Sequence, residues 1–214
     1  CILLAMPVGE TAAVLAQLAP YLKPGAIVTD AGSTKSNVIA AARSALGTRL
    51  ADFVPGHPIA GSEQSGPAAA HADLYLGRRV VLTPLADTDA GALATVRALW
   101  EAAGAQVELL DAALHDRVFA AVSHLPHLAA FALVDELAQR PDSDLFFRFA
   151  ASGFRDFTRI AASHPEMWRD ICIANKAALL GELEQYQGAP NPSVGFLVDD
   201  LDFSGVGMPA TSFD

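Results

Sequence analysis

Residues 26–46 decide the fold class, and they read AIVTDAGSTKSNVIAAARSAL. The apolar run Ala26–Asp30 has the length and composition of a buried strand, whereas Thr34–Leu46 repeats apolar side chains at helical spacing. A strand that enters a helix through a short turn is the building unit of a parallel α/β sheet. The stretch therefore predicts an α/β fold.

The same alternation runs from the first residue to about Leu110. Further strands are expected at Cys1–Ala5, Asp52–Pro55, Arg79–Thr83 and Gln106–Leu109, and further helices at Glu10–Tyr21 and Ala90–Ala103. Helical crossovers between parallel strands are right-handed, so this part of the chain is expected to form a doubly wound parallel sheet.

After Leu110 the pattern is helical. Helices are expected at Ala112–Gln139, Asp144–Ser163 and Pro165–Gln187, and Pro165 suits the first turn of a helix with a capping residue just before it. The predicted organisation is an α/β domain over residues 1–110 and an all-α domain over residues 111–187. The remainder, 188–214, is rich in Gly, Pro, Asp and Ser and is expected to be a poorly ordered or atypical tail.

Composition and charge exclude several classes of protein. The formal net charge of −10 at pH 7 disfavours binding to nucleic acid. Charged residues or Pro interrupt each apolar run before the roughly 20 residues that a membrane helix needs, so no membrane partner is expected. Cys1 and Cys172 cannot build a disulfide framework and no signal peptide is recognisable, so a cytoplasmic location is expected. We interpret the opening strand without an initiator Met as the start of a fragment.

Two polar turns follow predicted strands. Asp30–Lys35 would place backbone N–H groups and the Ser33 hydroxyl at the carboxyl edge of the sheet, where open α/β sheets bind ligands. The alternative is an ordinary strand–turn–helix cap. In the predicted loop Gly56–Gly66, His57 can accept or share a proton near neutral pH, or it can simply satisfy backbone groups.

The helical half carries a second set of polar residues. His115 and Asp116, followed by His124 and His127, are compatible with a metal site, a structural polar helix or a substrate-facing surface. Pro126 should kink this helix, because it leaves a backbone carbonyl one turn earlier without its usual donor. Farther along, arginines near residues 155–169 have the side chain best shaped to grip a carboxylate, although each could be a solvated helix charge.

Taken together, these motifs are similar to those of one family. Their order along the chain is DAGSTK (30–35), GHPIAGSE (56–63), SHLPH (123–127) and GFRDFTR (153–159) with MWRD (167–170). In this combination the chain resembles the prephenate/arogenate dehydrogenase family from Cys1 to about Gln187. The resemblance implies that residues 1–110 are the C-terminal part of a Rossmann-type dinucleotide-binding domain, and that residues 111–187 form a helical domain that binds substrate and forms a homodimer.

The resemblance also implies a reaction. It is the oxidative decarboxylation of prephenate or arogenate, with hydride transfer to NAD or NADP, in tyrosine biosynthesis. The hydride leaves the ring carbon that carries the hydroxyl group, and CO2 leaves as the ring becomes aromatic. Because aromatisation drives the loss of CO2, such a protein mainly orients the ring and the nicotinamide and handles one proton.

Roles for individual residues come from the same resemblance. His57 matches the catalytic histidine that accepts the hydroxyl proton, and Ser33 matches the serine that hydrogen-bonds this hydroxyl and His57. Arg159 matches an arginine that binds a substrate carboxylate. The other residues expected at the substrate are His124, His127, Ser62, Glu63, Ser152, Gly153 and Trp168, although Ser152 stands where the family often has Gly. The residues expected against the cofactor are Met6, Pro7, Val8 and Ser33.

Two further expectations concern the cations that a dianionic substrate needs and the part of the family's domain that would precede Cys1. A dianion such as prephenate needs local cations in an acidic protein, and Arg159 with His124 and His127 would supply them. The family's glycine-rich turn would precede Cys1, so the chain by itself is expected to bind NAD(P) poorly and to show little or no turnover. Two alternatives stay open: a non-catalytic helical dimerisation module that senses tyrosine, and a metal-dependent hydrolase built on His115, Asp116, His124 and His127. No metal is expected in the leading interpretation.

Overall fold

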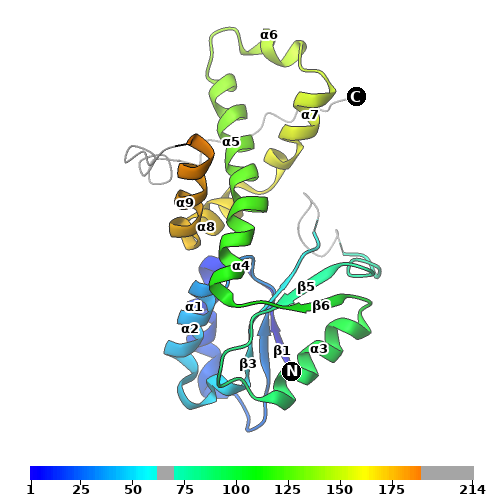
Figure 1. Cartoon of the computed structure of the whole chain (residues 1–214), viewed down its shortest axis with the longest axis vertical. Coiled ribbons are helices and arrows are strands. Elements are labelled where there is room, and N and C mark those ends of the chain that lie inside the picture. Colours follow the sequence, from blue (N-terminus) through cyan, green and yellow to red (C-terminus); the bar gives the residue numbers. More distant parts are fainter. Residues whose placement is uncertain (62–69, 189–214) are drawn as a thin grey trace. The chain divides into compact units, whose positions relative to one another are not determined.

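The computed structural model describes residues 1–61 and 70–188. They separate into two units, and the boundary between the units lies between Val118 and Phe119. Strands and the helices that cover them make up the first unit, and the described part of the second unit consists of helices and turns (Figure 1). The predicted class, a partial Rossmann-type parallel sheet followed by a helical domain, is confirmed.

The strands of the first unit pair into two three-stranded sheets. The first sheet is parallel and contains, in spatial order, β1 (Ile2–Leu4), β2 (Val28–Asp30) and β3 (Phe53–Val54). In the second sheet, β5 (Arg79–Leu82) pairs antiparallel with β4 (Gly56–Pro58) and parallel with β6 (Gln106–Leu109). Since β1 and β2 are parallel neighbours, the turns that follow them lie at the same edge of the first sheet.

The expectation of a loop from Gly56 onward is wrong for its first three residues. His57 lies on β4, opposite Val81 of β5. Pro55 has no backbone N–H and separates β4 from β3. A strand of three residues that contains Gly and Pro shows no periodicity, so its sequence reads as a turn.

Helices cover the strands from both sides. In Figure 1, α1 (Thr11–Leu18) and α2 (Ser36–Leu46) lie on one side and α3 (Ala90–Ala102) lies on the other. Phe53 belongs to the core that includes Leu15 of α1, and its neighbour Val54 belongs to the core that includes Val96 of α3. Consecutive residues of β3 therefore point to opposite faces, each of which is covered by helices. Short 3-10 turns complete this unit: η1 (Val8–Glu10), η2 (Ala19–Tyr21) and η3 (Gly47–Asp52).

The long helix predicted at Ala112–Gln139 is interrupted where Pro126 requires it. It consists of α4 (Ala112–Phe119), the π-helical turn η5 (Ala120–His124) and α5 (Leu125–Ala138). Pro126 stands in the first turn of α5 and cannot donate a backbone hydrogen bond. The N–H of Leu125 donates to the carbonyl of Ala120, five residues earlier. The helix is therefore widened into a π-helical turn before Pro126, where a kink was expected.

The stretch Ala112–Ala138 is long and apolar enough to cross a membrane by length and composition, contrary to the expectation that no run would be. One such helix is weak evidence for a membrane span, because the core helix of a water-soluble protein passes the same test. Here Leu128, Phe131 and Val134 are buried, and α5 packs against neighbouring helices of its own unit.

The rest of the second unit consists of shorter helices than predicted. They are α6 (Ser143–Arg148), α7 (Ser152–Thr158), the 3-10 turn η6 (Arg159–Ala162), α8 (Pro165–Ala174) and α9 (Lys176–Gln187). The start of α8 at Pro165 agrees with the prediction, although no side chain caps it. Asn175, with φ −109° and ψ 25°, separates α8 from α9 where one continuous helix was expected.

Candidate functional site

A buried ion pair joins the ends of two strands in the first unit. Asp30, the last residue of β2, accepts hydrogen bonds from the backbone N–H of Gly32 at 2.8 Å and of Gly56 at 3.0 Å. The ammonium group of Lys35 forms an ion pair with Asp30 and donates to the carbonyl of Gly56. Burial lowers the pKa of Lys35, although the charge of Asp30 opposes this effect. The residue just before His57 is thus held by both members of the pair.

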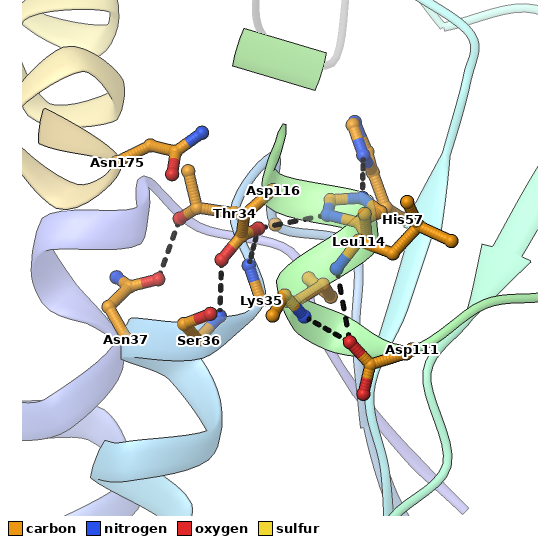
Figure 2. Close-up of polar contacts among 12 residues, drawn as sticks. Thr34, Lys35, Ser36, Asn37, His57, Asp111, Leu114, Asp116 and Asn175 are labelled. Carbon is orange, nitrogen blue, oxygen red and sulfur yellow. Dashed lines mark hydrogen bonds and ion pairs between the residues drawn. The ribbon is translucent and has the colours of Figure 1, made fainter. Parts of the chain in front are cut away.

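The N-terminus of α2 is occupied by a carboxylate of the same unit. Asp116 on α4 accepts the backbone N–H of Lys35 and of Ser36, each at 2.8 Å (Figure 2). Burial alone would raise the pKa of Asp116, but hydrogen bonds from His115, Ser36 and Lys35 hold it at about 2. The carboxylate therefore occupies the N–H of Lys35, which belongs to the turn that was expected to bind a ligand, and the N–H of Ser36 next to it.

Two imidazoles extend from this carboxylate to β4. His115 Nδ1 lies 2.9 Å from Oδ1 of Asp116, and His115 Nε2 lies 2.8 Å from Nδ1 of His57. The two rings meet edge to face with centroids 5.0 Å apart. His115 is fully buried and His57 is half-buried. We call Asp30, Lys35, His57, His115 and Asp116 the carboxylate cluster.

The residues expected against a cofactor come together at one edge of the parallel sheet. Met6, Pro7 and Val8 follow β1, and Ser33 lies half-buried in the turn after β2. A Cβ at Gly32 would lie 3.2 Å from Cγ1 of Val8 and 2.9 Å from Oδ2 of Asp30, so glycine permits the two turns to approach this closely. Open α/β sheets bind their ligands at this edge, so the position of these turns is compatible with the expected cofactor site.

The second unit holds a different group of polar and aromatic side chains. The amide nitrogen of Asn175 lies 3.1 Å from Nδ1 of His124. The ring of Trp168 stacks on that of His127, with centroids 3.5 Å apart and an interplanar angle of 15°. His127 Nδ1 lies 2.9 Å from the carbonyl oxygen of Ser123, and burial lowers the pKa of His127. We call His124, His127, Trp168 and Asn175 the aromatic cluster.

The other predicted substrate residues that the structure describes are exposed. Arg159 is exposed at the start of η6, and Ser152 and Gly153 are exposed in the first turn of α7. Ser62 and Glu63 lie outside the described residues.

Neither the pairing of His115 with His57 nor the role of Asp116 at α2 was predicted from the sequence. A metal site was one of three alternatives for His115 and Asp116. Among the residues that the structure describes, no group of three or more His, Cys, Asp or Glu side chains could hold a metal ion. The pairing leaves no signal in the sequence because its members are far apart along the chain. Asn175 was missed as well, although an Asn inside a predicted helix is a weak sign of a break.

Two family models match the chain. Residues 1–109 match the model described as prephenate dehydrogenase, nucleotide-binding domain. Residues 111–191 match the model described as prephenate dehydrogenase, dimerization domain. The two matches follow each other with a one-residue gap and cover far more than half of the chain.

Curated relatives are similar over most of this chain. A cyclohexadienyl dehydrogenase of Zymomonas mobilis is 40% identical over 187 residues, which are 86% of this chain and 63% of the relative. A prephenate dehydrogenase of Bacillus subtilis is 38% identical over 86% of this chain and 50% of its own length. The chain thus spans about half to two thirds of these relatives.

A solved structure has the same fold. The crystal structure of prephenate dehydrogenase from A. aeolicus, in complex with hydroxyphenyl propionate and NAD+, aligns with a TM-score of 0.80 and 42% sequence identity. The alignment covers 92% of this chain and 68% of the other.

Proposed function

We propose, because the chain belongs to the prephenate dehydrogenase family, that it forms part of an enzyme of tyrosine biosynthesis that oxidatively decarboxylates prephenate or arogenate with NAD or NADP. The observation that supports this most is the hydrogen-bonded chain from Asp116 through His115 to His57. In this chain of hydrogen bonds a histidine is linked to a buried carboxylate. Both lie in the unit whose sheet edge is proposed to bind the cofactor.

His57 is proposed as the group that takes the hydroxyl proton of the substrate. A half-buried imidazole can exchange a proton at neutral pH, and a positioned base of this kind contributes on the order of 10²–10⁴ to the rate. Bound NAD(P)+ would supply the hydride acceptor. Ser33, at the same edge as Met6, Pro7 and Val8, is proposed to orient the hydroxyl group and the nicotinamide.

Arg159 is proposed to bind a carboxylate of the substrate, and its guanidinium group is always charged. The expectation that His127 adds a second cation is not supported, because burial lowers the pKa of His127 and leaves it neutral near pH 7. The carbonyl of Ser123 can only accept, so neutral His127 carries its proton on Nδ1 and offers Nε2 as an acceptor. His127 therefore suits a hydroxyl or amino group of the substrate. His124, Ser62, Glu63, Ser152, Gly153 and Trp168 remain proposed lining residues.

The experiment is a kinetic assay of the complete protein that contains these residues. Reduction of NAD+ and NADP+ is measured with prephenate and with arogenate. His57→Asn is expected to lower kcat by about 10²–10⁴-fold with little change in KM. Arg159→Ala is expected to raise KM chiefly.

His71→Asn makes the same replacement at an exposed histidine of the same unit, and it should behave as wild type. Equal and mild effects of His57→Asn and Arg159→Ala would contradict the proposed roles. If the protein binds tyrosine in calorimetry but turns over neither substrate, the non-catalytic sensing module is correct instead.

A homodimer formed through residues 111–191 and a cytoplasmic location are also proposed. The match to a dimerization domain supports the first. Sedimentation equilibrium of the purified protein would test it, and a monomer at micromolar concentration would contradict it.

A further inference from the structure

We propose that Asp116 acts through His115 to hold His57 as the tautomer with its proton on Nδ1, so that Nε2 is the atom that exchanges a proton with the substrate. The inference rests on the proposed function for the identity of the substrate. It assigns positioning roles to His115 and Asp116, and both roles follow from hydrogen-bond chemistry within the first unit.

The first step concerns Asp116. Its two oxygens accept the N–H groups of Lys35 and Ser36 at 2.8 Å, which fixes the carboxylate at the N-terminus of α2. An ionised carboxylate has acceptor sites alone, and the pKa of about 2 keeps Asp116 ionised. The ring nitrogen 2.9 Å from Oδ1 must therefore donate, so His115 carries a proton on Nδ1.

The second step shows how the proton on Nδ1 of His115 determines the tautomer of His57. A neutral imidazole has one donor and one acceptor nitrogen, so Nε2 of His115 accepts. His57 Nδ1, which lies 2.8 Å away, must then donate. Burial lowers the pKa of His115; Asp116 and Asp30 oppose this effect and the charge of Lys35 adds to it. A neutral His115 leaves the lone pair of a neutral His57 on Nε2.

The arrangement suits a base that must first take a proton and then return it. Bound NAD(P)+ would accept the hydride while the O–H bond of the substrate breaks, the proton bonds to Nε2 of His57, and the oxygen's electron pair forms the ring carbonyl. When CO2 leaves, the electrons of its C–C bond enter the ring, and Nε2 returns the proton to the ring oxygen. Between these steps, the carboxylate of Asp116 stabilises the His57 imidazolium through His115.

The experiment reads the tautomer directly. The full-length protein is labelled with ¹⁵N in its histidine rings, and the His57 signals are assigned by their loss in His57→Asn. The wild-type protein should show His57 protonated on Nδ1. His115→Leu leaves Asp116 at the N-terminus of α2 but removes the acceptor for His57, so the proton should move to Nε2 in a substantial fraction of molecules.

Kinetics supply a second readout. His115→Leu should lower kcat by about 10²-fold with KM nearly unchanged. The acid limb of the profile of kcat/KM against pH should move to lower pH, because the imidazolium of His57 loses its acceptor. Asp116→Asn should act in the same direction, and it serves if His115→Leu does not fold. Asp111→Asn makes the same replacement at the exposed cap of α4, where Asp111 accepts the N–H of Ala113 and Leu114, and it should change neither readout.

Either of two results would overturn the proposal: wild-type His57 protonated on Nε2, or a tautomer and pH profile that His115→Leu and Asp116→Asn leave unchanged. The tautomer measurement needs no turnover. A protein that shows the Nδ1 tautomer and its loss in His115→Leu, but oxidises neither prephenate nor arogenate, would preserve this inference and reject the proposed function.

Discussion

The carboxylate cluster and the aromatic cluster both bury histidines, but they satisfy them in different ways. In the first, the hydrogen bonds of His115 lead to the ionised Asp116. In the second, His127 bonds to a backbone carbonyl and stacks on Trp168, and His124 bonds to the amide of Asn175. Histidine therefore interacts with an ionised carboxylate in the first unit. In the second unit it interacts with an aromatic ring, a backbone carbonyl and an amide.

The difference shows that the partner of a buried histidine decides its chemistry. A carboxylate partner fixes which ring nitrogen carries the proton and stabilises an imidazolium, whereas a carbonyl or amide partner orients a neutral ring. Changes of charge should therefore act strongly on the carboxylate cluster. Loss of a neutral hydrogen bond in the aromatic cluster should have a small effect.

The largest effect is expected from Lys35→Met. The substitution leaves the carboxylate of Asp30 buried without its cation, which costs about 3–5 kcal/mol of unfolding free energy. The double variant with Asp30→Asn removes both charges of the pair, leaves no unpaired charge at this position and should recover part of this loss. Urea denaturation measures both. A single variant as stable as the double one would show that the ion pair does not govern this cluster.

An intermediate effect is expected in acid. The pKa of Asp116 is lowered from an ordinary 3.8 to about 2 in the folded protein, so the stability that it contributes is present above about pH 4 and is lost as the pH falls towards 2. The shift corresponds to about 2 kcal/mol. The difference in unfolding free energy between wild type and Asp116→Asn should shrink by this amount over that range. Asp111→Asn controls for the loss of one carboxylate, and an equal pH dependence in both variants would contradict the prediction.

The smallest effect is expected in the aromatic cluster. Asn175→Ala removes the amide that lies 3.1 Å from Nδ1 of His124. A neutral hydrogen bond contributes about 1 kcal/mol net, so the loss of unfolding free energy should be of that size. Gln139→Ala, which removes an exposed amide, is the matched control and should cost less. A loss as large as that of Lys35→Met would erase the contrast between the two clusters.

Most of the fold was predicted from local sequence patterns. Strand β2 and helix α2 were predicted within two residues of their observed bounds, and α8 begins at Pro165 as expected. Periodicity and first-turn proline are properties of neighbouring residues, which the sequence displays directly. The errors lie where elements are short or where a single residue breaks a helix, as at β4 and at Asn175.

The candidate site also contains residues that could be proposed from the sequence and partners that could not. His57 and Ser33 could be proposed because each stands in a compact motif that resembles a motif of the family, and their roles are proposals. The partners of these motifs could not be proposed. His57 and His115 are 58 positions apart, and Lys35 and Asp116 are 81 positions apart.

The sequence by itself determined the fold class and, through a set of short motifs, the family and the choice of His57 as the proposed base, because each motif and each periodic segment consists of neighbouring residues. Tertiary structure alone decided that a carboxylate on α4 fills the N-terminus of α2, and that a second imidazole lies between this carboxylate and His57. The physical reason is that hydrogen bonds form between groups about 3 Å apart whatever their separation in sequence. Only the folded chain brings α4, α2 and β4 within that distance.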